Sequence, residues 1–130
     1  MFNIFKGRIK KFITESQHNK NLESQLSMSP QTVEQLREYG VKDDTKLKLE
    51  YFFYTNDKEK AEKLSNELSS IGYASEYGSS ADDKKIFIIT GWSSPILMTT
   101  HTVVEWTKKM CNLGFCNDCE FDGWGTNPEQ

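Results

Sequence analysis

The sequence lacks the features of a membrane-spanning protein and of a secreted one. No stretch of its 130 residues approaches the roughly eighteen consecutive apolar residues of a transmembrane helix. The first residues, MFNIFKGRIKKFITES, contain neither an uninterrupted apolar core nor the small-residue cleavage site of a signal peptide. The three cysteines are an odd number, so they cannot all pair within one chain. Together these absences lead us to expect a cytoplasmic protein.

Motifs of catalysis and of metal binding are also missing. The chain has no G-x-S-x-G, no H-E-x-x-H and no glycine-rich phosphate loop, and neither His18 nor His101 has a Ser or Cys at a motif spacing. Cys111, Cys116 and Cys119 follow the C-x4-C-x2-C opening of a plant-type iron–sulfur motif, but the fourth cysteine is missing. A zinc site would need His101, ten residues upstream, as its fourth ligand. We therefore expect no enzyme activity and no cofactor, and interpret the cysteines as partly buried thiols rather than as metal or redox groups.

Charge is unevenly distributed along the chain. Residues 1–20 contain five Lys and Arg against one Glu, a net charge of +4, whereas the remaining residues contain eleven basic and eighteen acidic groups, a net charge of −7. Nucleic-acid binding depends on a surplus of Lys and Arg that neutralises phosphates, so the acidic body argues against it. Such a body suits a protein partner with a basic surface.

The N-terminal segment has an amphipathic pattern. Its apolar residues recur at helical spacing with lysines between them: Phe2, Phe5, Ile9, Phe12 and Ile13. This predicts a basic amphipathic helix that either contacts a membrane surface or a partner, or packs on its own domain. The polar stretch ESQHNKNLESQLSM then predicts a linker. We accordingly divide the chain into an extension at residues 1–28 and a domain at residues 29–130.

The domain alternates between strand and helix patterns. Alternating side chains predict strands over about 46–55, 73–77, 86–92 and 119–121. Capping residues, prolines and glycines predict helices from Ser29-Pro30 to Gly40, from Asn56-Asp57 to Gly72, and from Ser94-Pro95 to Gly114. After a first helix the order is β-α-β-β-α-β, which predicts a ferredoxin-like α+β sandwich: a four-stranded antiparallel sheet with both helices on one face.

The opposite face of this sheet is predicted to be partly apolar. Phe52 and Tyr54 share one side of the first strand, and the third strand, IFIITGW, is apolar on both sides. Either the N-terminal segment covers this face or it is a contact surface. An RNA-recognition module of the same topology would stack bases on such aromatic residues. The third strand lacks the glycine-aromatic signature of that module, so single-stranded RNA binding is the alternative and not the main interpretation.

The C-terminal stretch CEFDGWGTNPEQ has an unusual composition, with a tryptophan between two glycines. Asp122-Gly123 predicts a turn, Gly125 predicts a second unusual backbone angle, and Trp124 is expected to fold back onto the sheet edge as an apolar anchor. On this interpretation the stretch fixes the last strand to the rest of the fold. The alternative is a binding site, because an aromatic anchor beside acidic groups suits a basic partner.

This stretch resembles the closing motif of the ribonuclease E inhibitor family, the regulators of ribonuclease activity B. In that family an acidic residue and an aromatic residue precede Asp-Gly-Trp, as Glu120 and Phe121 do here, and Gly125 and Thr126 follow. LREYGVKDD and LSSIGYASEY are similar to its helix end and its helix-to-strand passage, so the resemblance covers about residues 30–127. The basic N-terminal segment and the cysteine cluster depart from the family pattern.

The resemblance implies a ferredoxin-like domain that binds ribonuclease E and restrains its RNA cleavage by protein contact, without catalysis of its own. We expect a protein partner, either ribonuclease E or another nuclease with a basic surface. The expected contact residues are Trp124, Asp122, Phe52 and Tyr54, with Gly123 and Gly125 as structural turn residues. An adaptor for an unrelated protein is a further alternative.

Overall fold

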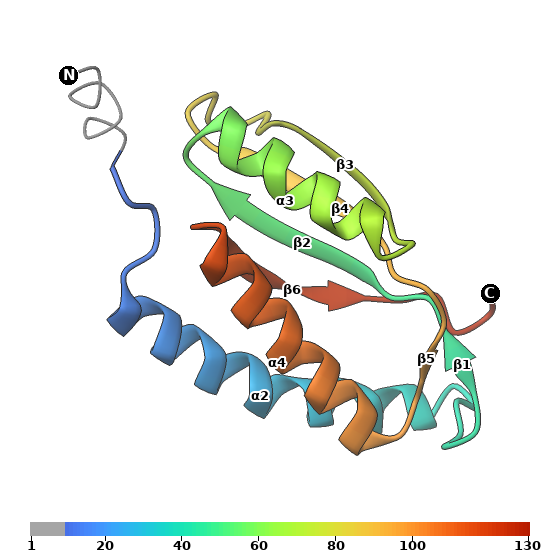
Figure 1. Ribbon diagram of the computed structural model, residues 1–130. Coiled ribbons are helices and arrows are strands. Elements are labelled where there is room, and N and C mark those ends of the chain that lie inside the picture. The colour runs from blue at the N-terminus through green and yellow to red at the C-terminus, as the bar shows by residue number, and fades with distance from the viewer. Residues whose placement is uncertain (1–9) are drawn as a thin grey trace, which may run out of the picture.

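The computed structural model describes residues 10–130 as three helices and six strands (Figure 1). In chain order the elements are α2 (Glu15–Arg37), β1 (Lys46–Leu47), β2 (Glu50–Thr55), α3 (Lys58–Ser70), β3 (Ala74–Ser79), β4 (Phe87–Trp92), β5 (Ile96–Leu97), α4 (Thr100–Cys116) and β6 (Glu120–Gly125). None of the described helices is long and apolar enough to cross a bilayer.

The four main strands form one antiparallel sheet in the order β3-β4-β2-β6, and β1 and β5 form a small second sheet. Helices α3 and α4 lie across one face of the four-stranded sheet, and α2 lies beside α4 (Figure 1). The strand order and the β-α-β-β-α-β connectivity from β2 to β6 are those of the ferredoxin-like sandwich. The predicted fold class is therefore confirmed.

The sheet face under the helices carries the core. Tyr51 and Phe53 of β2 are fully buried, and Phe53 lies opposite Ile89 of β4 and Phe121 of β6. The rings of Phe53 and Phe121 have centroids 5.2 Å apart. Alternate residues along β2 therefore point either into this core or to the opposite side, which fixes the register of the strand.

The predicted linker is wrong, because residues 15–28 form the first half of α2. Thr14 caps this helix in a capping box with Gln17, and Pro30 lies inside the helix instead of at its start. The buried side of α2 includes polar as well as apolar side chains, so the sequence shows no helical spacing of apolar residues there. Its buried residues are His18, Gln25, Ser29, Val33 and Leu36. One helix thus crosses the boundary expected at residue 28. The predicted amphipathic helix lies mostly outside the described residues, and residues 10–14 are not helical.

Helix α4 differs from its prediction at both ends. It begins at Thr100, with Thr99 as its cap, because Ile96 and Leu97 pair with Leu47 and Lys46 in the small sheet. It also continues through Gly114, where a Cβ atom would lie 2.9 Å from both the Phe53 ring and the Cys119 carbonyl oxygen. Gly114 therefore serves close packing of α4 on the sheet and is not the predicted stop signal.

One carboxylate binds the backbone of residues 12 and 13 to the domain. The Asp118 carboxylate accepts hydrogen bonds from the backbone N–H groups of Phe12 (2.8 Å) and Ile13 (3.0 Å) and from the Lys60 ammonium (2.7 Å). Asp118 itself has a left-handed backbone, with φ 55°. Burial alone would raise the pKa of Asp118, but the bonds from Lys60 and the two amides outweigh it and lower that pKa. We call this group the Asp118 latch.

We predict that Asp118→Asn lowers the free energy of unfolding by about 2 kcal/mol, because it removes the charge that three donors share. Asparagine tolerates the left-handed backbone and so isolates the electrostatic part of the change. Since the folded pKa of Asp118 is lowered, its contribution is present above the ordinary value of 3.8 and is lost as the pH falls through the folded value. Urea denaturation should therefore show a difference at neutral pH that shrinks below pH 3.8, whereas Asp82→Asn in the exposed hairpin loop should show none.

Candidate protein-binding site

Strand β6 carries an irregularity at the Asp-Gly-Trp element. Phe121 pairs with Phe53 and Gly123 pairs with the adjacent Phe52, so Asp122 is the extra residue of a β-bulge. Gly123 has φ 123°, which an L side chain rarely adopts, whereas Gly125 has no positive φ. The turn predicted at Asp122-Gly123 is therefore a bulge within the strand, and the unusual backbone angle predicted at Gly125 is not observed. The bulge presents Asp122 at the surface of the sheet edge.

Trp124 fastens β6 to both neighbouring helices. Its indole N–H donates to the Ser29 hydroxyl of α2 at 3.0 Å, and its ring meets Trp106 of α4 edge-on with centroids 6.2 Å apart. The Ser29 and Thr107 hydroxyls lie 2.6 Å apart, and the Thr107 hydroxyl donates to the Val103 carbonyl at 2.8 Å. Thr107 has a single proton to give, so Ser29 must be the donor to Thr107. A directed relay therefore runs from Trp124 through Ser29 and Thr107 to the backbone of α4.

Three of the four predicted contact residues line one hollow. We call it the β6 hollow; its volume is about 260 Å³ and it lies between α2 and the edge of the sheet. Its lining residues are Gln25, Met28, Ser29, Thr32, Phe52, Asp122, Gly123 and Trp124. Met28 is 45% exposed at its rim. Phe52, Asp122 and Trp124 thus lie together, whereas Tyr54 is not part of the hollow.

Tyr54 belongs to the sheet face that points away from the helices. We call this the outer face and define it by the outward side chains of the four strands: Glu50, Phe52 and Tyr54 of β2, Ala74 and Glu76 of β3, Ile88, Thr90 and Trp92 of β4, and Glu120 of β6. Within residues 10–130 no helix packs on this face (Figure 1). Its aromatic side chains are only partly buried. Phe52 belongs to both surfaces and joins the β6 hollow to the outer face.

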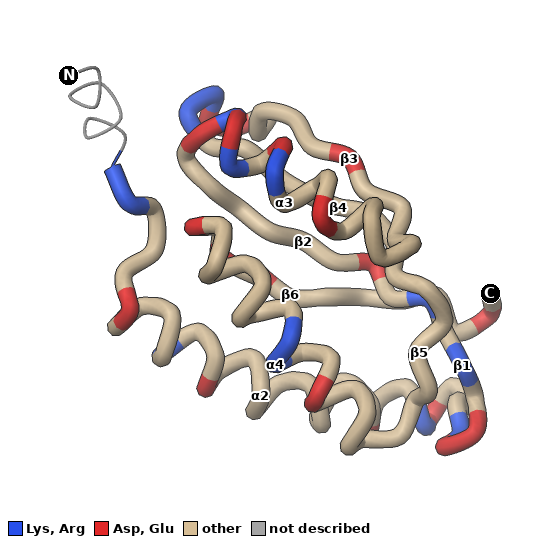
Figure 2. Tube along the Cα trace, viewed as in Figure 1, with Lys and Arg blue, Asp and Glu red and all other residues tan. Residues whose placement is uncertain are grey.

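The charges beside these aromatic residues are acidic. By the strand register Glu50 of β2 and Glu76 of β3 belong to the outer face, and no outward residue of the four strands is Lys or Arg. Figure 2 shows acidic residues along the sheet. Burial raises the pKa of Glu120, and the nearby Asp122 charge raises it further. Burial also raises the pKa of Asp122. Two carboxylates that repel each other at the sheet edge would be stabilised by a cation placed between them.

The outer face also contains a polar group that the sequence did not reveal. The Thr90 hydroxyl is buried and has no hydrogen-bond partner within the described residues. It lies on β4 opposite Phe52 of β2 and Glu76 of β3, at the middle of the face. A buried hydroxyl without a partner is costly. Only the pairing register places it there, so no local pattern in the sequence could have identified it.

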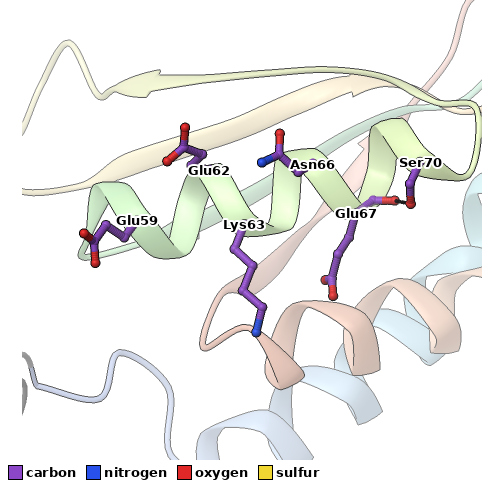
Figure 3. A pocket seen from close by; sticks show the side chains of 6 residues that line it. All are labelled: Glu59, Glu62, Lys63, Asn66, Glu67 and Ser70. Carbon is purple, nitrogen blue, oxygen red and sulfur yellow. Dashed lines mark hydrogen bonds between the residues drawn. The ribbon is translucent and has the colours of Figure 1, made fainter.

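Neither the hollow on α3 nor the cysteines contain the predicted contact residues. The hollow in Figure 3 is lined by side chains of α3 alone, among them Glu62, Lys63 and Glu67, and contains none of the predicted contact residues. Burial raises the pKa of both Cys111 and Cys119 to about 12, so neither thiol ionises near neutral pH. Among the described residues, no three His, Cys, Asp or Glu side chains converge as metal ligands.

We predict that two substitutions of Trp124 separate the energy of its hydrogen bond from that of its packing. Trp124→Phe keeps an aromatic ring but removes the N–H that donates to Ser29, which should cost about 1 kcal/mol of unfolding free energy. Trp124→Ala also removes the packing against Trp106 and should cost about 3 kcal/mol. Chemical denaturation of both variants, alone and with Ser29→Ala, measures these costs. Additive effects of Trp124→Phe and Ser29→Ala would contradict the relay, because residues of one hydrogen-bond chain must couple.

Comparison with known proteins places the chain in a family. No curated protein sequence matches the chain significantly. The family model described as "Regulator of ribonuclease activity B" matches residues 27–126, a range that contains the four-stranded sheet, α3, α4 and the Asp-Gly-Trp element. The match starts within α2, three residues before Pro30, and covers most of the chain. The chain therefore belongs to the family of regulators of ribonuclease activity B.

Proposed function

We propose that this protein regulates a ribonuclease of the ribonuclease E type by binding it directly, without catalysis of its own, through the β6 hollow and the adjoining part of the outer face. Membership of the regulator family supports the role in ribonuclease activity. The observation that carries the binding mode is the convergence of Phe52, Asp122 and Trp124 in one hollow. No single stretch of sequence requires that convergence.

The surface has the composition of a protein-binding site for a basic partner. Aromatic side chains supply most of the binding energy at such contacts, and a central aromatic group surrounded by polar residues is typical of them. The carboxylates of Asp122 and Glu120 can accept hydrogen bonds from Arg or Lys. Because both pKa values are raised in the free protein, a nearby cation also stabilises the charged form of each carboxylate. An arginine of the partner is best suited, since its planar group stacks on an aromatic ring and also binds a carboxylate.

The remaining features fit a regulator that acts by contact. All three cysteines are unpaired, as in proteins of a reducing compartment such as the cytoplasm. The outward residues of the sheet carry acidic groups and no basic ones, which disfavours an RNA ligand on the aromatic face. Whether RNA cleavage is restrained then depends on which surface of the ribonuclease this protein covers.

We predict that Asp122→Lys weakens binding to ribonuclease E from the source organism by roughly tenfold or more, because it places like charges against a basic partner. Titration by calorimetry or surface plasmon resonance measures the affinity, and a cleavage assay measures whether the ribonuclease regains its activity. Glu105→Lys is the matched control, since Glu105 is exposed on α4 and undergoes the same charge change away from the site. Equal affinities of Asp122→Lys and wild type would refute the proposed surface.

We predict that the affinity falls as the pH is lowered, and that the fall begins above the ordinary carboxyl values of 4.5 and 3.8. A basic partner stabilises the charged carboxylates, so binding lowers their raised pKa values and releases protons. Affinities measured between about pH 7 and about pH 5 should therefore decrease towards acid. The double variant Glu120→Gln and Asp122→Asn should bind more weakly and show a flatter profile. A steep profile in that variant would assign the titration to other groups.

A further inference from the structure

We propose that residues 1–9 of this chain dock on the outer face of its own sheet and thereby compete with the protein partner for Phe52 and Tyr54. The occupant is a segment of the chain that lies outside the described residues. Its docking does not depend on the proposed function; only the competition does. Three observations about the outer face and the start of the described chain support this assignment.

The first observation is the place where the segment joins the domain. The Lys10 carbonyl oxygen accepts hydrogen bonds from the Asn56 side chain (2.8 Å) and the Lys60 ammonium (3.0 Å). Asn56 follows the last residue of β2, and Tyr54 is two residues before it. Glu120 pairs with Tyr54 across the sheet. Lys10 therefore lies at the end of the sheet where Tyr54 and Glu120 face outward.

The second observation is length. Nine extended residues reach about 30 Å, whereas a six-residue strand is about 20 Å long. Each of the four main strands has six residues. An extended segment is therefore long enough to pass round the end of the sheet from Lys10, which Lys60 of α3 holds on the helix side, and to run along the outer face.

The third observation is chemical complementarity. Residues 1–9, MFNIFKGRI, contain Phe2, Ile4, Phe5 and Ile9 together with Lys6 and Arg8, and no acidic residue. The outer face offers the reverse combination, because its aromatic and aliphatic side chains are accompanied by Glu50, Glu76 and Glu120 and by no basic group. Apolar contacts would hold the segment, and the charges would orient it.

Because the segment is attached to the domain, it occupies the face when no partner is bound. A short covalent connection gives an effective concentration in the millimolar range. A weak intramolecular contact is therefore well populated, and a partner must bind tightly enough to displace it. The N-terminal segment then sets a threshold for binding.

Paramagnetic relaxation enhancement in the full chain tests the docking directly. A spin label is attached to Asn3→Cys in a chain that also carries Cys116→Ser, since Cys116 is the exposed native thiol and Cys111 and Cys119 are buried. We expect several-fold stronger broadening of the Ile88 methyl and the Trp92 indole on the outer face than of Val103 in α4. Uniformly weak broadening, or broadening strongest at Val103, would overturn the proposal.

Two further arms separate the occupants of the face. Lys6→Glu with Arg8→Glu should abolish the broadening, whereas Lys108→Glu with Lys109→Glu on the exposed side of α4 should leave it intact. Broadening that appears only between labelled and isotope-labelled copies in a mixed sample would mean that a second chain occupies the face, and would overturn the intramolecular proposal.

The competition is tested with the ribonuclease. Deletion of residues 1–9 should raise its affinity several-fold, and the Lys6 and Arg8 double variant should do the same. Docking without any change in affinity would overturn the competition alone. Docking in a protein that binds no ribonuclease would overturn the proposed function but not the docking.

Discussion

The relay from Trp124 through Ser29 and Thr107 is the interaction on which the arrangement of the edge depends. Strand β6 is at the end of the sheet, and without a neighbour its exposed edge would be open to pairing with other chains. Helix α2 covers that edge, because Trp124 donates to Ser29 and the Asn21 side chain donates to the Phe121 carbonyl at 2.9 Å. The relay joins three elements through the buried residues Ser29 and Thr107, so the two hydroxyl groups are satisfied only when all three elements are in place.

This arrangement gives Trp124 two roles that the sequence presented as alternatives. Its N–H and much of its ring are committed to α2 and α4, as expected of a structural anchor. The part of the side chain that remains exposed lines the β6 hollow together with Asp122 and Phe52. A partner that binds there would contact a rigid aromatic group, and little entropy would be lost in ordering it.

Local patterns predicted the elements whose residues alternate or repeat cleanly, namely β2, α3 and β4, and the resemblance at Asp-Gly-Trp predicted the family. The errors have physical causes. Polar residues such as His18 and Ser29 occupy the buried side of α2, so its period was hidden. Ile96 and Leu97 were predicted to belong to a helix, because their strand partners are about fifty residues away in the sequence. The bulge at Asp122 depends on the β2–β6 register, which no local rule gives.

The Asp118 latch has a consequence for the order of folding. It joins Phe12 to a carboxylate 106 residues later in the chain, and Lys60 to the same carboxylate across 58 residues. Contacts that close such long loops form only after the intervening chain is ordered, because the loop entropy must be lost first. We therefore expect the β2, α3 and β6 elements that position Lys60 and Asp118 to assemble before residues 10–13 settle. Residues 10–13 should also be the first part of the described chain to be released.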